Sequence, residues 1–178
     1  MESVRVIKES RTVILNGEIT DSVAADVCFA LLQLESENPS GWITLMINSP
    51  GGSVHAGWQI VDTIKLIGNV ETINIGLCGS MAAIIHMAGD KGYRLVLPHA
   101  KTLLHQPLGG AQLMQASDFE ITAREMARTK KELYTFISEC TGKTIDQVTK
   151  DCDRDYWLDA DESVAYGLAD RIVTADNR

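Results

Sequence analysis

Short runs of β-branched and apolar residues alternate with helical patterns along almost the whole chain of 178 residues, and this alternation constrains the fold most. It is typical of an α/β protein whose strands pair mostly in parallel. No linker, repeat or low-complexity tract interrupts it, so we expect one domain over residues 1–178. The predicted strands are 12–15, 42–48, 70–77, 94–97, 102–104 and 171–174, and the predicted helices are 22–35, 54–67, 81–88, 118–140 and 161–167, with a further short helix after Thr144.

Several helix ends have recognisable signals. Ser117 and Glu120 have the spacing of a capping box at the start of the longest helix, and Gly142 predicts its end. Thr144 and Gln147 have the same spacing at the start of the next helix. The helix at 81–88 is apolar on nearly every side, which predicts that it is buried.

Charge and cysteine content exclude several classes of protein. The chain has 24 acidic and 16 basic residues, a net charge of −8, which disfavours nucleic-acid binding. Its four cysteines form no C-x-x-C pair, so we expect reduced thiols and no zinc ribbon. No signal peptide and no apolar run of about 18 residues is present. We therefore expect a soluble, cytoplasmic protein with neither a nucleic-acid nor a membrane partner.

Familiar catalytic and nucleotide-binding motifs fail on inspection. Residues 142–144 resemble the end of a P-loop, but Ile137 stands where its first glycine should be. No G-x-G-x-x-G and no H-E-x-x-H is present. The lipase-type elbow G-x-S-x-G fails around Ser80, because Cys78 and Ala82 occupy the glycine positions.

Three segments at predicted strand ends carry groups suited to acyl transfer. Residues 48–52, Asn-Ser-Pro-Gly-Gly, offer backbone N–H groups that a ligand can approach closely. Ser80 follows a strand and begins the buried helix, so its hydroxyl lies at the positive end of the helix dipole. His105 ends an apolar strand. Together they supply a nucleophile, a base and an oxyanion donor.

Each segment also has an ordinary structural interpretation. Serine before a helix is most often an N-cap, a lone histidine is often a core residue, and paired glycines usually form a turn. The chemistry further needs a carboxylate to orient the histidine, and spacing does not choose one from the 24 acidic residues.

Around residues 48–52, Ser80 and His105, the sequence resembles the family of Clp protease proteolytic subunits. The members of this family are serine peptidases. The resemblance implies an α/β fold of the crotonase/Clp-protease type, a spiral of repeated β-β-α units with a protruding strand-helix handle at about 111–140. It covers residues 13–173. The segments that carry it are INSPGG (47–52), GLCGSMAA (76–83), LLHQPLGG (103–110), ITAREM (121–126), TGKTIDQV (141–148) and DRDYWLDADESVAYGLAD (153–170).

The resemblance implies a role for each matching residue. Ser80 corresponds to the nucleophile, His105 to the base and Asp155 to the carboxylate that orients the histidine. The backbone N–H groups of Gly52 and Met81 correspond to the oxyanion hole. The resemblance implies hydrolysis of peptide bonds through an acyl-enzyme, with no metal and no cofactor in this chain.

The resemblance also implies assembly into heptameric rings stacked face to face as a tetradecamer, with the active sites enclosed in a chamber. Asp118 and Arg154 correspond to a pair that joins the two rings. An AAA+ unfoldase ATPase would feed peptide and protein substrates into the chamber, and ATP would act on that partner. The corresponding ATPase-docking surface consists of Thr44, Met46, Leu66, Ile73, Ile75, Leu95 and Leu97.

Some positions depart from the family pattern. Thr44 and Met46 stand where aromatic residues are usual, one extra residue lies between Gly110 and Asp118, and little precedes 4–11, so we expect the pore-lining N-terminal segment to be short, trimmed or absent. The alternatives are an ATPase-independent accessory or phage-type paralogue, a subunit of a mixed ring with a paralogue (including a non-catalytic one), and a crotonase-type acyl-CoA enzyme.

Overall fold

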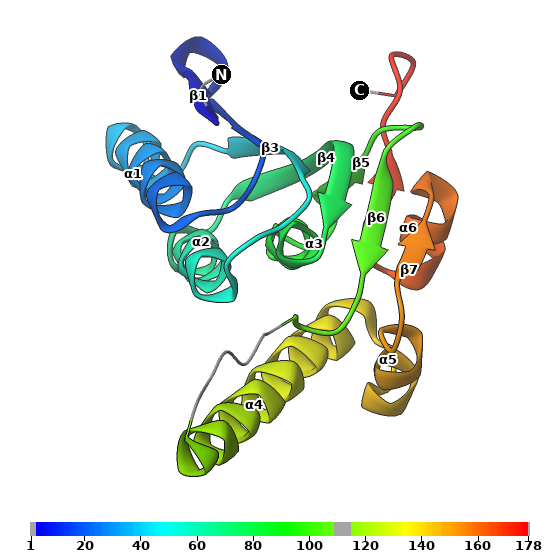
Figure 1. The fold of residues 1–178 in the computed structure, drawn as a ribbon. Coiled ribbons are helices and arrows are strands. Elements are labelled where there is room, and N and C mark those ends of the chain that lie inside the picture. The colour runs from blue at the N-terminus through cyan, green and yellow to red at the C-terminus, as the bar shows by residue number, and fades with distance from the viewer. Residues whose placement is uncertain (1–2, 109–114, 178) are drawn as a thin grey trace.

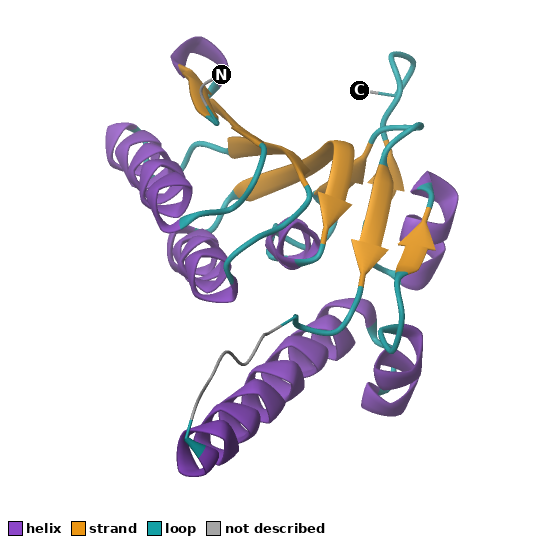
Figure 2. Ribbon diagram, viewed as in Figure 1, coloured by secondary structure: helices purple, strands orange, loops and turns teal. Residues whose placement is uncertain are grey.

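The computed structural model describes residues 3–108 and 115–177, which form a mixed sheet with helices around it (Figures 1 and 2). The strands are β1 (Val4–Ile7), β2 (Thr12–Asn16), β3 (Ile43–Ser49), β4 (Val70–Gly79), β5 (Arg94–Val96), β6 (Lys101–Leu104), β7 (Tyr156–Leu158) and β8 (Arg171–Ile172). The helices are α1 (Asp21–Glu37), α2 (Val54–Ile67), α3 (Met81–Met87), α4 (Ala116–Thr141), α5 (Ile145–Asp151) and α6 (Ala160–Tyr166), with a 3-10 turn at Lys8–Ser10.

The sheet divides at β4. Its main path runs β1-β2-β3-β4-β5-β8, while β6 pairs with β4 and β7 pairs with β6. The first half of β4 pairs with β5 through Thr72–Asn74, and its last residues pair with β6 through Leu77–Gly79. All pairs are parallel except β1 with β2 and β6 with β7. The division places the end of β4 beside the end of β6.

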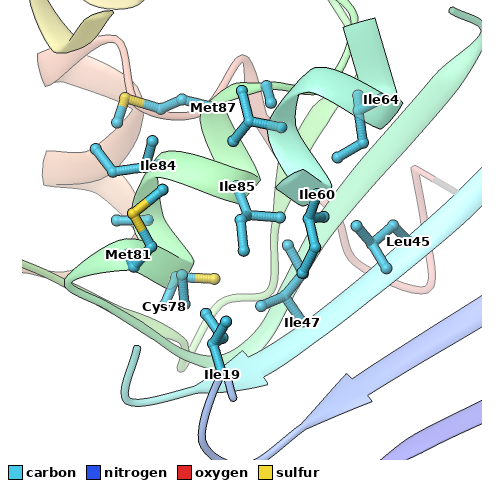
Figure 3. Packing of buried hydrophobic residues seen from close by; sticks show 14 of the residues in the cluster. Ile19, Leu45, Ile47, Ile60, Ile64, Cys78, Met81, Ile84, Ile85 and Met87 are labelled. Carbon is cyan, nitrogen blue, oxygen red and sulfur yellow. The ribbon is translucent and has the colours of Figure 1, made fainter. Parts of the chain in front are cut away.

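The hydrophobic core lies between the sheet and helices α1, α2 and α3. Strand β3 alternates strictly, with Ile43, Leu45 and Ile47 buried, as a sheet with one covered face requires. Helix α3 is buried along its entire length, and Figure 3 shows Ile85 directed toward Ile60 of α2 and Ile47 of β3. Because α3 is completely buried, the position of Ser80 at its N-terminus is fixed.

Helix α4 projects away from the sheet (Figure 1). Its buried residues are Leu133, Tyr134 and Ile137, all in its C-terminal half. Its N-terminal half exposes large apolar side chains, with Phe119 54% and Ile121 57% exposed. Phe119 and Met126 are seven positions apart and share one side of the helix, whereas Ile121 points to the opposite side. All three are exposed within the described part of the chain.

The α/β class and the mostly parallel pairing are confirmed, and every predicted strand and helix is present with small differences at its ends. Thr144 caps α5 by accepting a hydrogen bond from the Gln147 N–H, but the Gln147 side chain donates to Asp151, so the reciprocal half of the predicted capping box is not formed. The capping box at Ser117 is wrong, because α4 begins at Ala116 after Gln115 and Ser117 lies within its first turn. Strands β1 and β7 were not predicted. The expected handle strand falls partly on residues 111–114, outside the described residues.

Candidate active site

Ser80 occupies a strained turn between β4 and α3. Its backbone has φ +53° and ψ −123°, a region that non-glycine residues rarely adopt and that costs on the order of 1–3 kcal/mol. Its side chain makes no capping hydrogen bond, although Ser80 is the N-cap residue of α3. Its N–H donates to the Leu103 carbonyl at 2.8 Å, which ties the turn to β6. The hydroxyl is thus not used in capping the helix.

His105 lies beside Ser80 in one cavity. The register pairs Gly79 with Leu103, so Ser80 comes opposite Leu104, and His105 follows Leu104 directly. Both residues line a cavity of about 230 Å³. The His105 Nδ1 lies 2.7 Å from the Gln106 carbonyl, and because a carbonyl only accepts, that nitrogen carries the proton. Nε2 is therefore the ring nitrogen left to act as an acceptor.

The predicted oxyanion donors line the same cavity. Gly52 is fixed by a parallel bridge to Ile19, and Met81 is the first residue of α3, where N–H groups have no partner within the helix. Gly51 packs directly on the Ser80 turn, because a Cβ built on it would lie 2.7 Å from the Ser80 Cβ and from the Gly79 carbonyl oxygen. Only glycine permits this approach between the two strand ends.

Asp155 stands next to His105 in the strand register but is not bonded to it. Strands β6 and β7 pair Leu104 with Tyr156, so the next pair outward is His105 with Asp155. Asp155 is exposed and does not line the cavity. The acceptor that holds the His105 Nδ1 is the Gln106 carbonyl. The structure therefore places Ser80 and His105 in one cavity, and places Asp155 next to His105 only in the strand register.

Several residues of the cavity were not predicted from the sequence. Leu133, Tyr134 and Ile137 of α4 reach it from 25 or more positions downstream of His105, together with Ile84 of α3. The signal that could have found them is the apolar spacing at the C-terminal end of α4. They make the cavity mainly apolar.

Cys78 is close to Ser80 in sequence but not in chemistry. It is fully buried, and burial raises the pKa of its thiol well above the ordinary value. The thiol therefore stays protonated and does not compete as a nucleophile. All four cysteines are unpaired. In the described ranges, no three His, Cys, Asp or Glu side chains gather as metal ligands would.

The expected docking and ring-contact residues lie elsewhere. Leu66 is 80% exposed on α2 and does not line the cavity that the other docking residues share. Asp118 in the first turn of α4 and Arg154 form no ion pair with each other within the described chain. The remaining six docking residues line a second cavity of about 930 Å³ on the sheet face opposite α3: Thr44, Met46, Ile73, Ile75, Leu95 and Leu97.

Among the described residues, the Ser80 hydroxyl and the His105 Nε2 have no hydrogen-bond partner, and both line a cavity that also contains backbone donors. This arrangement is typical of the serine hydrolases that work by acyl transfer. The sequence model of the family described as Clp protease matches residues 1–176. The chain therefore belongs to the Clp protease family, and as a member it is a serine peptidase.

Individual relatives agree with this assignment. The chain is 48% identical over 169 residues to the ATP-dependent Clp protease proteolytic subunit of Porphyromonas gingivalis. The aligned region covers 94% of this chain and 76% of that protein. The chain is 48% identical over 165 residues to the ATP-dependent Clp protease proteolytic subunit 2 of Prochlorococcus marinus, covering 92% and 82%. The subunit of Bacteroides fragilis is 48% identical over 164 residues, covering 92% and 79%. No helix among the described residues is long and apolar enough to cross a membrane.

Proposed function

We propose that this chain is the proteolytic subunit of an ATP-dependent Clp protease and cleaves unfolded proteins and peptides with Ser80 as nucleophile, His105 as general base and Asp155 as the orienting carboxylate. The observation that carries the proposal is the Ser80 turn. Its backbone is strained, and its hydroxyl makes no capping hydrogen bond to α3. Ser80 also lines the cavity that contains His105. A serine that served only as a helix cap would have neither property.

The chemistry follows from the arrangement of these groups. The Ser80 oxygen attacks a peptide carbonyl while the His105 Nε2 takes the hydroxyl proton. The N–H groups of Gly52 and Met81 stabilise the oxyanion, and His105 then returns the proton to the leaving amine. Water hydrolyses the acyl-enzyme by the same steps. These steps use only protein groups and water, and ATP is consumed by the partner.

The cavity supports an apolar substrate residue before the cleaved bond. Its lining contains no Asp, Glu, Lys or Arg among the described residues. Ile84, Leu133 and Ile137 contribute apolar walls, and about 230 Å³ accommodates one side chain of leucine or methionine size. A charged side chain there would lose its hydration without gaining a partner, so the proposal predicts poor cleavage after Asp or Lys.

Two surfaces support assembly. The exposed apolar side of α4 that holds Phe119 and Met126 fits a contact between rings of seven chains, and we include the double ring in the proposal. The second cavity, lined by Met46, Ile73 and Leu95, supports docking of an AAA+ ATPase and makes an ATPase-independent role the weaker alternative. Relatives numbered 2 and 3 leave a mixed ring with a paralogue as an alternative.

Four unpaired thiols support a cytoplasmic location.

The test combines covalent labelling of Ser80 with peptide hydrolysis. A fluorophosphonate should label the wild type once per chain, and Ser80→Ala should abolish both labelling and cleavage of a fluorogenic peptide ending in leucine. Native mass spectrometry should give the same assembly for both proteins. Ser36→Ala, at an exposed serine of α1, a helix that contributes no residue to the cavity lining, is the control and should behave as the wild type. Cleavage retained in Ser80→Ala would refute the proposal.

A further inference from the structure

The side chain of Gln106 joins three elements next to the predicted catalytic histidine. Its Oε1 accepts a hydrogen bond from the Lys130 Nζ of α4 at 3.2 Å. Its Nε2 donates to the Asp153 carbonyl at 3.2 Å, in the segment that leads into β7. Lys130 is itself held over the Tyr134 ring, 5.3 Å from its centroid. The amide is therefore fixed from both sides.

The backbone of the same residue holds the imidazole. The Gln106 carbonyl accepts the His105 Nδ1 proton at 2.7 Å, which fixes the tautomer and leaves Nε2 to act as the base. The direction of that carbonyl depends on the position of Gln106, which the Lys130 and Asp153 bonds determine. The chain thus has two acceptors for one proton, the carbonyl now engaged and the Asp155 carboxylate at the next register position.

We infer that Gln106 is a positioning residue for His105, acting through its amide bridge to Lys130 and Asp153 and sharing with Asp155 the task of fixing the imidazole tautomer. This inference rests on the proposed role of His105 as base. The bridge also connects the imidazole to α4, so a displacement of that helix is transmitted to His105 through a single hydrogen-bonded side chain. In the proposed peptide hydrolysis, neither the Gln106 side chain nor Lys130 contacts the reacting atoms.

The inference predicts a specific kinetic pattern. Gln106→Ala should lower kcat about 10-fold to 100-fold, because a misdirected imidazole loses the aligned geometry, while KM stays within about twofold. Lys130→Met should have a smaller effect in the same direction. Lys130→Arg should restore the wild-type kcat, because arginine still donates to Oε1. Lys131→Met, at an exposed neighbour on α4, is the control and should leave kcat unchanged.

A double-mutant cycle separates positioning from general loss of structure. In the Asp155→Ala background the carbonyl is the remaining acceptor, so Gln106→Ala should reduce kcat there by a larger factor than in the wild type. Native mass spectrometry verifies that each variant assembles. An unchanged kcat in Gln106→Ala, or an equal factor in both backgrounds, would overturn the inference. Failure of the wild type to be labelled at Ser80 would instead refute the proposed function, so the two failures are distinguishable.

Discussion

At the scale of single residues, the predicted site depends on how closely two strand ends approach. Gly51 has φ +101°, and a side chain there would meet Ser80 and the Gly79 carbonyl. The pairing of β3 with β4 shifts register between Ile47 and Ser49, shortly before these two strand ends. The glycine therefore shapes the turn that presents the nucleophile, although it contributes no reacting group.

We expect Gly51→Ala to lower kcat/KM about 100-fold, because the added methyl displaces the Ser80 turn. Gly142→Ala is the matched control. Gly142 also has a positive φ, +74°, but a Cβ there meets nothing within 4 Å. It should cost about 1 kcal/mol of stability and leave kcat/KM unchanged. Steady-state hydrolysis with urea unfolding of both variants checks the prediction, and equal activities would contradict it.

His86 predicts how stability depends on pH. It is 1% exposed, its Nε2 lies 2.8 Å from the Leu95 carbonyl, and burial lowers its pKa to about 4. The unfolded chain takes up the proton near pH 6.5, so the stabilisation is complete above that pH and is lost as pH falls toward 4. We expect a loss of about 2 kcal/mol between pH 7 and pH 5 from this residue.

The measurement is the urea midpoint at pH 7 and pH 5, at one protein concentration. His86→Gln retains a donor for the Leu95 carbonyl but does not titrate, so its midpoint should fall less than that of the wild type. His99→Gln, at an exposed histidine, should keep the wild-type pH dependence. Identical pH dependence in wild type and His86→Gln would show that His86 is not the group responsible.

At the scale of elements, one arginine joins the ends of three of them. The Arg94 side chain is 6% exposed and donates to the Cys140 carbonyl of α4, the Gly167 carbonyl after α6 and the Asp170 carboxylate before β8. Burial of Asp170 opposes ionisation, but its bonds from Arg94 dominate and hold the pKa of that carboxyl below its ordinary value. The C-terminal part of the fold is thereby fastened to β5.

We expect Asp170→Asn to destabilise the protein by about 3 kcal/mol, because it leaves a buried guanidinium without its counter-charge. Glu132→Gln is the control, since it breaks the Arg128–Glu132 pair, whose side chains are 72% and 49% exposed. That change should cost less than about 0.5 kcal/mol. Urea unfolding of the two variants gives the comparison, and similar midpoints would contradict the expected difference.

The elements also show what the sequence could and could not predict. Helix α2 matches its predicted range of 54–67, because Ser53 caps it and Gly68 ends it. Strand β7 escaped prediction because it has only three residues and pairs with β6, about 50 positions away. The candidate residues Ser80 and His105 came from local patterns and family resemblance, whereas the Gln106 bridge depends on Lys130 and Asp153, contacts that no local pattern encodes.

At the scale of the whole molecule, the two residues of the proposed ring contact, Asp118 and Arg154, are exposed on the single chain. Helix α4 extends beyond the sheet (Figure 1), and Asp118 lies in its exposed first turn. The Arg154 side chain is 91% exposed, with the Asp153 carboxylate at 4.0 Å as its ion-pair partner within the chain. Every chain carries a net charge of −8, so the two facing rings of the proposed assembly would repel each other. A contact between opposite charges would offset part of that repulsion.

The proposed pairing of Asp118 with Arg154 of another chain is testable by exchanging the charges. Arg154→Asp should shift the population from double rings toward single rings, because it replaces an attraction with a repulsion. Arg154→Asp combined with Asp118→Arg should restore double rings, since the attraction returns with its sign reversed. Lys91→Asp makes the same charge change at an exposed residue outside α4 and should sediment as the wild type. Sedimentation velocity at low and high salt measures the populations of single and double rings. Arg154→Asp should regain double rings at high salt, because salt screens the repulsion between like charges. If the charge-exchanged double variant sedimented like Arg154→Asp alone, the two residues would not be partners.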